Sequence, residues 1–116
     1  MPEIGFPVEV VEGVPVVRAP EEIDIANAGG LKAALLEATG LEAAGPGRAL
    51  VVVDMSRTRF SDSAGLNALV AVARQTRAEG GEVRLVVVAG AVARLLALNG
   101  VDRVIPIYAS LEDALS

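Results

Sequence analysis

The chain has 116 residues, of which 53% are hydrophobic but only 3% aromatic, and its formal net charge is −5. This length predicts a single domain over residues 1–116 with a core of Val, Leu, Ile and Ala. The acidic balance argues against nucleic acid as a partner, because binding to phosphates needs a concentrated basic surface. The absence of Cys and His excludes disulfides, thiolate nucleophiles, His-dependent triads and zinc sites made of these residues.

The N-terminus gives no sign of a targeting segment. Residues Met1–Pro7 contain no basic region followed by an apolar stretch, and no segment reaches the roughly 18 uninterrupted apolar residues that a membrane span needs. We therefore expect a cytoplasmic protein without a membrane span.

The first predicted unit is a β-hairpin. Val8–Val11 and Val14–Ala19 are short Val-rich runs separated by Glu12-Gly13, a pattern typical of two strands joined by a tight turn. Pro15 cannot donate to a β-ladder, so its end of the second strand is expected at an edge or beside a gap in pairing.

A first helix is predicted over Ala28–Thr39. Asn27 stands in front of it as a good N-cap, and Gly40 can end it. The segment Leu41–Gly47 then has the composition of a loop.

Two continuous apolar runs, Leu50–Val53 and Val83–Val88, predict parallel strands covered on both faces. The spacing of apolar residues between them predicts a crossover helix over Ser63–Glu79. A short helix through Val92–Leu98, a strand at Val104–Ile107 and a last helix capped by Ser110 complete the chain. We expect an α/β fold: one mixed, mostly parallel sheet with an N-terminal β-hairpin and about four helices.

The most informative segment is Asp54–Leu66, a polar stretch that leaves a predicted central strand and enters a helix. Loops of this kind lie at the carboxyl edge of a parallel sheet, where α/β folds place ligands and partners. Ser63 follows Asp62 and is expected in the first turn of the helix, where unpaired N–H groups and the helix dipole favour negative charge. The simpler interpretation, in which Ser61, Asp62 or Ser63 only caps the helix, remains open from spacing alone.

The segment Phe60-Ser61-Asp62-Ser63-Ala64-Gly65-Leu66 resembles the Phe-x-Asp-Ser-x-Gly-Leu core of the STAS family, named for sulfate transporters and anti-sigma factor antagonists. Glu22–Asn27 resembles the family's segment before its first helix, and Gly80-Gly81-Glu82 and Asn99-Gly100 resemble its later turns. The resemblance covers nearly the whole chain in order. It implies the STAS fold.

The resemblance also implies a function in transcription regulation. In bacterial regulatory members, the Ser of the Asp-Ser pair is phosphorylated by a kinase that is also an anti-sigma factor. By position, Ser63 would be the phosphorylated residue of an anti-sigma factor antagonist that sequesters an anti-sigma factor serine kinase while unphosphorylated, and a phosphatase would act on Ser63. Two residues depart from the family pattern, Pro20 and Ala64, and Ala64 leaves Ser61 as the main rival phosphoacceptor in the loop.

A partner-binding surface is expected around Ser63. Spacing places small residues on the face of the second helix opposite its apolar stripe, so a partner could lie flat there, although good helix formers on a solvated face give the same pattern. Burial of Phe60 and Leu66 is expected to hold the loop in place. The residues predicted to contact the partner are Asp24, Asn27, Asp62, Ala64, Gly65, Asn67, Ala68 and Ala71.

The sequence supports other classes of function less well than a phosphorylatable protein-binding switch. Asp24, Asp54 and Asp62 could form a Mg²⁺ site, but no Gly-rich phosphate cradle accompanies them, and we expect no metal or cofactor. An enzyme is disfavoured, because no pair of nucleophile and base is visible. The main alternative is a constitutive STAS subunit of a larger assembly, such as a stressosome or a lipid-transport complex.

Overall fold

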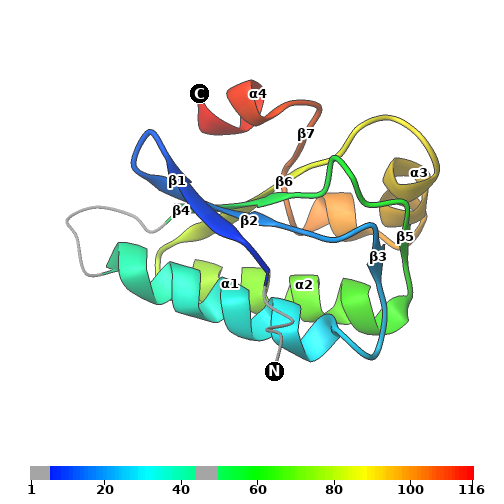
Figure 1. Cartoon of the computed structure of the whole chain (residues 1–116), viewed down its shortest axis with the longest axis horizontal. Helices are drawn as coiled ribbons and strands as arrows, with labels where there is room; N and C mark the ends of the chain where they lie inside the picture. Colours follow the sequence, from blue (N-terminus) through cyan, green and yellow to red (C-terminus); the bar gives the residue numbers. More distant parts are fainter. Residues whose placement is uncertain (1–5, 44–49) are drawn as a thin grey trace.

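The predicted hairpin and parallel strands form one five-stranded sheet in the order β1-β2-β4-β6-β7 (Figure 1). The computed structural model describes residues 6–43 and 50–116. Strand β1 is antiparallel to β2, and the other neighbouring strands are parallel. The strands span Val8–Val11 (β1), Val14–Arg18 (β2), Leu50–Asp54 (β4), Glu82–Val86 (β6) and Ile107–Tyr108 (β7). The predicted mixed, mostly parallel α/β fold is confirmed.

The helices divide unequally between the two faces of the sheet. Helices α1 and α2 lie side by side along one face, whereas the short α4 lies on the other (Figure 1). Helix α3 and a 3-10 turn, η1, lie near the end of the sheet that carries the loop before α2. The helical elements span Ala28–Ala43 (α1), Ser63–Ala78 (α2), Ala91–Leu98 (α3), Val101–Arg103 (η1) and Leu111–Leu115 (α4).

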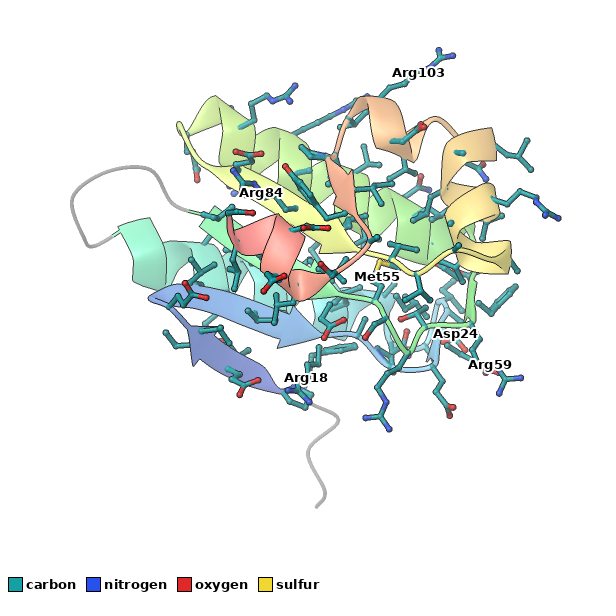
Figure 2. All side chains as sticks on the ribbon, turned by 90° about the horizontal axis from the view of Figure 1, so that it is seen from above. Arg18, Asp24, Met55, Arg59, Arg84 and Arg103 are labelled. Carbon is teal, nitrogen blue, oxygen red and sulfur yellow. The ribbon has the colours of Figure 1, made fainter. Side chains whose placement is uncertain are left out.

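The main core lies between the sheet and α1, α2 and α3. Alternate strand residues point into it, Leu31 and Leu35 enter from α1, and Met55, which follows β4, is fully buried in it (Figure 2). Almost all of its side chains are aliphatic, as the composition predicts. The fully buried strand and α2 members include Val17, Val51, Val53, Leu85, Leu69 and Val72.

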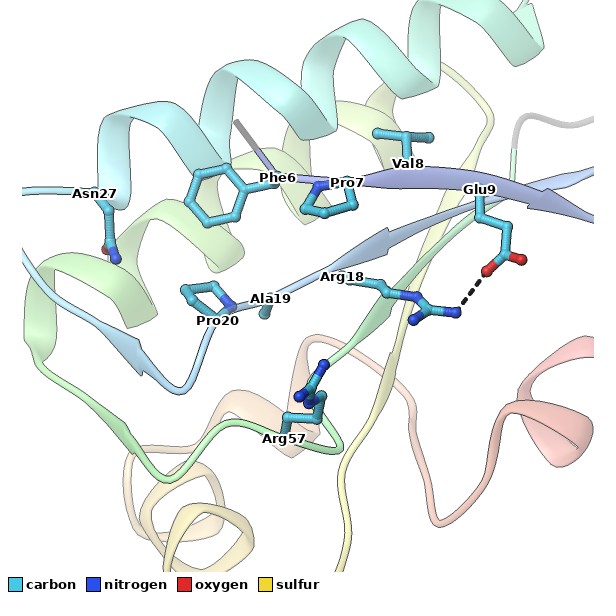
Figure 3. A pocket seen from close by; sticks show the side chains of 9 residues that line it. All are labelled: Phe6, Pro7, Val8, Glu9, Arg18, Ala19, Pro20, Asn27 and Arg57. Atoms are coloured by element: carbon cyan, nitrogen blue, oxygen red, sulfur yellow. Dashed lines mark hydrogen bonds and ion pairs between the residues drawn. The ribbon is translucent and has the colours of Figure 1, made fainter. Parts of the chain in front are cut away.

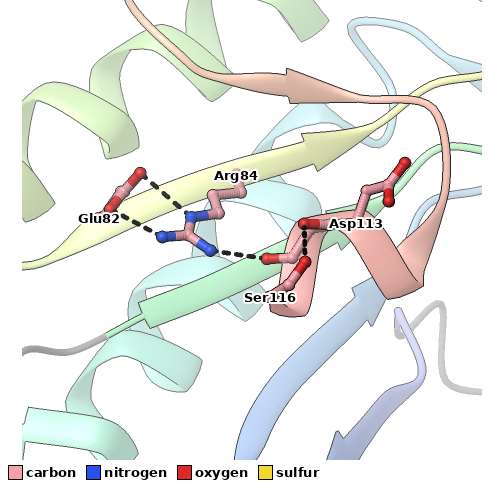
Figure 4. Close-up of polar contacts among 5 residues, drawn as sticks. Glu82, Arg84, Asp113 and Ser116 are labelled. Carbon is pink, nitrogen blue, oxygen red and sulfur yellow. Dashed lines mark hydrogen bonds and ion pairs between the residues drawn. The ribbon is translucent and has the colours of Figure 1, made fainter.

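A smaller apolar cluster covers the opposite face. Val16, Val52 and Val86 point toward α4 and pack with Ala114. Arg84, from the same face of β6, is half-buried there: its Nη1 donates to the carbonyl of Ala114 at 2.7 Å, and its Nε pairs with a carboxylate oxygen of Glu82 at 3.2 Å (Figure 4). The guanidinium carbon also lies 5.6 Å from the centre of the Tyr108 ring. Arg84 therefore fastens α4 to the sheet.

The hairpin turn has the predicted chemistry. Glu12 and Gly13 both have positive φ angles, 52° and 80°, as a turn with two left-handed central residues requires. Pro15 pairs with Val10 of β1, and the ladder between β2 and β4 starts one residue later, at Val16. The expected gap in pairing beside Pro15 is confirmed.

The predicted carboxyl end of the first helix is wrong. Helix α1 continues through Gly40 to Ala43, because Gly40 adopts the helical conformation at a cost of about 1 kcal/mol instead of the left-handed one that ends helices. The predicted loop at Leu41–Gly47 is therefore helical at 41–43, and its remainder lies outside the described residues. Helix α2 starts at Ser63 as predicted.

The last strands are also displaced from their predicted positions. The strand predicted at Val104–Ile107 begins only at Ile107, because the N–H groups of Val104 and Ile105 bond to the carbonyl of Val101 in η1. Strand β6 ends at Val86, opposite the last residue of β4, so Val87 and Val88 lie outside the strand, although the N–H of Val87 still donates to the carbonyl of Tyr108 at 2.9 Å.

A second, two-stranded sheet was not predicted. Strand β3 (Glu22–Ile23) pairs in parallel with β5 (Phe60–Ser61). It connects the segment before α1 to the segment before α2 and brings the amino ends of both helices to the same end of the molecule (Figure 1).

Replacing Arg84 tests the attachment of α4. Arg84→Ala should lower the free energy of unfolding by about 1–3 kcal/mol, because it leaves a carboxylate and a carbonyl without their partner. Urea unfolding followed by circular dichroism measures this, with Arg103→Ala as the control, since Arg103 is exposed and points away from the molecule (Figure 2). The control should stay within about 0.5 kcal/mol of the wild type. Equal effects of the two substitutions would contradict the role of Arg84.

Candidate functional site

Ser63 is exposed and is the first residue of α2. The position predicted for it, a helix amino end open to solvent, is confirmed. The first N–H groups of a helix have no acceptor within the helix, and they carry the positive end of its dipole. The hydroxyl of Ser63 is thus placed where a negatively charged group would be stabilised locally.

The carboxylate of Asp62 fixes this end of α2. Asp62 is the N-cap: its Oδ1 accepts the N–H of Gly65 at 3.0 Å. Its Oδ2 accepts the N–H of Ile25 at 3.1 Å, and its own N–H donates to the carbonyl of Ile23 at 3.0 Å. A single residue therefore joins α2 to the segment before α1.

The segment Asp24–Asn27 forms a tight turn beside Asp62. Asp24 Oδ1 accepts the N–H of Ala26 at 2.9 Å, and the Asp24 carbonyl accepts the N–H groups of Asn27 and Ala28. Asn27 stands directly before α1 as predicted, but its side chain turns backward, accepting the N–H of Asp24 and donating to the carbonyl of Glu22. Both side chains shape the loop. Their predicted contact with a partner stays a prediction.

Gly65 is required by a close approach. A Cβ at this position would lie 2.6 Å from Cγ2 of Ile23 and would also collide with Oγ of Ser61. Ile23 is fully buried and β-branched, so it has little freedom to move. The Gly of the Asp-Ser-x-Gly-Leu motif thus lets α2 lie against the two-stranded sheet.

The hydroxyls of the segment Asp54–Leu66 differ in accessibility. Ser61 is only 2% exposed and donates to the carbonyl of Asp62, and Thr58 is 6% exposed and donates to the carbonyl of Pro20. Ser56 and Ser63 are exposed. Ser61, the rival phosphoacceptor of the sequence analysis, is therefore shielded from any enzyme in the folded chain.

The expectation for the two apolar residues that flank the motif is half right. Leu66 is buried, at 6% exposure, as predicted. The prediction that Phe60 is buried is wrong, because Phe60 is 50% exposed. Successive side chains of a strand point to opposite sides, and in β5 the inward position belongs to Ser61. The loop is held by the pairing of β3 with β5 and not by burial of the Phe60 ring.

The predicted small-residue face of α2 needs one correction. Asn67, Ala71 and Arg74 are exposed and Ala64 is half-buried, but Ala68 is buried together with Gly65. The exposure predicted for Ala68 is wrong because α2 packs against α1 as well as β6, so its buried stripe is wider than a single contact would give.

The second helix and the turn after α3 together form a hollow of about 270 Å³ beside Ser63. Asn67, Val70 and Arg74 line it from α2, and Asn99 and Gly100 line it from the other side. The sequence resemblance included Asn99-Gly100 only as a turn. Its position next to Ser63 depends on tertiary packing.

Sequence reasoning also missed two exposed apolar side chains near this end. Ile25, whose N–H is held by Asp62, is 82% exposed, and Leu98 at the end of α3, next to Asn99, is 79% exposed. The sequence offers a signal for each of them. Ile25 is an aliphatic residue in a polar turn, and Leu98 lies at the end of a helix, outside its buried apolar stripe.

The acidic residues do not assemble into a metal site. Within residues 6–43 and 50–116, no three His, Cys, Asp or Glu side chains lie close enough together to hold a metal ion. Asp24, Asp54 and Asp62 each accept an N–H within their own loop. In the same described ranges, no helix combines the length and apolar character needed to cross a membrane.

Comparison with known proteins identifies the family. The model of the STAS domain matches residues 6–114, almost the whole chain. The chain belongs to the STAS domain family. The match spans both the Asp24–Asn27 turn and the segment around Ser63, as the resemblance in the sequence predicts.

Solved STAS structures have the same fold. An anti-sigma factor antagonist from Mycobacterium paratuberculosis is 33% identical, with a TM-score of 0.80 over 95% of this chain and 89% of that one. SpoIIAA, a Bacillus cell fate determinant solved in its phosphorylated form, is 20% identical, with a TM-score of 0.67 over 96% of each chain. The murine anion transporter Slc26a9 is 22% identical, with a TM-score of 0.73 over 90% of this chain and 17% of that one. The comparison with curated protein sequences gave no match.

Substituting Gly65 tests the close packing at this end. Gly65→Ala should lower the free energy of unfolding by about 1–3 kcal/mol, since its methyl group overlaps Ile23. Gly29→Ala is the matched control, because Gly29 is also helical and a Cβ there meets nothing within 4 Å. The control should change stability by less than about 1 kcal/mol, in the stabilising direction. Denaturant unfolding measures both variants. A gain of stability in Gly65→Ala as well as in Gly29→Ala would contradict the close packing at Gly65.

Proposed function

We propose that this STAS domain is an anti-sigma factor antagonist whose binding to an anti-sigma factor serine kinase is switched by phosphorylation of Ser63. One observation carries the proposal: among the hydroxyls nearest the motif, Ser63 is exposed at the amino end of α2, whereas Ser61 and Thr58 are buried. The similarity to the Mycobacterium paratuberculosis antagonist, at 33% identity, supports the assignment.

The local geometry suits a phosphate on Ser63. Asp62 uses the N–H of Gly65, the third helical residue, so the cap does not consume the N–H groups of Ser63 and Ala64. These donors and the helix dipole would stabilise a phosphate on the hydroxyl. The modification would therefore add charge without unfolding the helix.

The unmodified surface has features that a protein partner could use. Ile25 is exposed on the turn before α1, which Asp62 holds. Asn67 and Ala71 are exposed along α2. The partner contacts that we propose include Asp24, Asn27, Asp62 and Ala64. Gly65 and Ala68 are buried and act by shaping this surface.

Phosphorylation would alter this surface by charge. A phosphate adds about 1.5 to 2 negative charges next to the carboxylate of Asp62, in a chain whose net charge is already −5. An interface that covers Ser63 would have to desolvate that charge beside the existing one. Release of the kinase follows, and a phosphatase that removes the phosphate restores binding.

In this cycle the chain is a substrate and a ligand, and catalysis belongs to its partners. The kinase binds ATP and supplies the catalytic groups, and the sigma factor becomes available when the kinase is sequestered. We assign the cycle to the cytoplasm, where sigma factors act on transcription.

Phosphorylation of Ser63 can be tested directly. Incubation with the partner kinase and ATP should add one phosphate, located on Ser63 by mass mapping of peptides, and Ser63→Ala should abolish it. Ser56→Ala is the control, because Ser56 is an exposed hydroxyl in the same segment. Its phosphorylation should match that of the wild type, and a label on Ser61 or Thr58 would refute the assignment of Ser63.

The affinity of the partner gives a second test. Phosphorylated chain should bind the kinase about 3 kcal/mol more weakly than unmodified chain, a factor of about 150 in the dissociation constant. Ser63→Asp should reproduce part of this loss, because a carboxylate has one charge and fewer acceptor oxygens. Titration calorimetry measures all three, and Ser56→Asp controls for added charge elsewhere in the loop. Equal affinities for the unmodified and phosphorylated forms would favour a constitutive STAS subunit of a larger assembly.

A further inference from the structure

A second hollow lies apart from Ser63, between the amino end of β1 and the carboxyl end of β2 (Figure 3). Its volume is about 540 Å³, within the range of about 300–1,000 Å³ that is typical of sites for small molecules. The rings of Phe6, Pro7 and Pro20 form much of its wall, together with the buried Ala19. The space is therefore mainly apolar, with Phe6 as the aromatic ring and the two prolines as saturated rings in its wall.

Two guanidinium groups lie at one side of this hollow. Arg57, from the loop after β4, points toward the space between Pro20 and Arg18 (Figure 3). Arg18 is held by Glu9, with Nη2 2.7 Å from the carboxylate. Among the described residues, the ion pairs are Arg18–Glu9 and Arg84–Glu82, so Arg57 takes part in neither. A guanidinium has five N–H donors, and most of those on Arg18 and Arg57 are available to a ligand.

The remaining polar group on the wall is Asn27. Its side chain is committed to the carbonyl of Glu22 and the N–H of Asp24, so it forms a fixed part of the wall. The site thus combines an apolar body, a rigid polar side and a cationic end, where the carboxylate of Glu9 on the same wall offsets Arg18 and Arg57 supplies the net positive charge. This is the usual composition of a small-molecule site, in which a few polar groups orient a mostly apolar ligand.

We propose that this hollow binds a small aromatic carboxylate, with its ring against Phe6 and Pro20 and its carboxylate on Arg57. Charge complementarity supports an anion, because planar guanidinium groups match the two oxygens of a carboxylate. The apolar rings of the wall, one of them the aromatic ring of Phe6, support an apolar aromatic body. The hollow shares Asn27 with the partner surface proposed around Ser63 but does not include Ser63 itself, and the inference does not depend on the proposed function.

The test uses 2-naphthoate and its uncharged analogue 2-naphthamide as probes of the folded chain. Titrations followed by amide nuclear magnetic resonance spectra should show saturable shifts at Phe6, Ala19 and Arg57 with 2-naphthoate. The amide should bind at least about fivefold more weakly, as loss of one partly exposed charge pair implies. Absence of saturable shifts at this hollow, or equal affinities for the two probes, would overturn the proposal.

Matched variants test whether the charge of Arg57 holds the carboxylate of the probe. Arg57→Gln should weaken 2-naphthoate at least about fivefold and leave 2-naphthamide unchanged, and Arg57→Lys should restore part of the loss. Arg59→Gln is the control, because Arg59 is exposed two residues away and does not line the hollow. All variants are exposed substitutions, and their amide spectra report whether they fold. A loss of affinity in Arg59→Gln as large as in Arg57→Gln would show a general effect of surface charge and refute the site.

Discussion

The carboxylate of Asp62 joins two segments that lie 37 residues apart in the chain. One oxygen caps α2 and the other holds the turn before α1, so each helix begins from a position that depends on the other. Hydrogen bonds that an ionised carboxylate accepts are stronger than neutral ones, and two of them from one side chain fix its orientation. The exposure of Ser63, the position of Ile25 and the pairing of β3 with β5 all rest on this junction.

The rest of the fold supports the junction from one side only. Helices α1 and α2 bury the main core against the sheet, and the parallel strands carry their carboxyl ends to the end where Asp62 lies. The opposite face has only α4, held by Arg84 over a small aliphatic cluster. The larger core therefore lies on the side of the sheet covered by α1 and α2, and Met55 and Leu66 join the two ends of the segment around the candidate binding surface to that core.

The sequence predicted the features that depend on near neighbours. Asp62 caps the residue three positions after it, and Glu12-Gly13 makes its turn without help from the rest of the chain, so both could be identified from local pattern. The parallel, buried character of the two central strands followed from their continuous apolar runs, whereas the order of the strands in the sheet did not. The family motif singled out Ser63 as the candidate switch residue. Capping chemistry alone does not distinguish Ser63 from the first residue of any other helix.

What the sequence could not predict depends on distant partners. Strands β3 and β5 have two residues each, too few for a periodic pattern, and their pairing joins segments that lie far apart in the chain. Phe60 and Ala68 were misjudged for the same reason: the side of β5 that faces inward and the number of neighbours of α2 are set by tertiary packing.

The burial of Ser61 and Thr58 limits which hydroxyls of this segment an enzyme can reach in the folded chain. Each hydroxyl is already donating to a backbone carbonyl inside the fold, so a kinase that meets the native protein finds neither of them. An opened loop would offer both. Modification of Ser61 or Thr58 would therefore require this loop to open first, whereas the exposed hydroxyl of Ser63 can be reached in the folded chain.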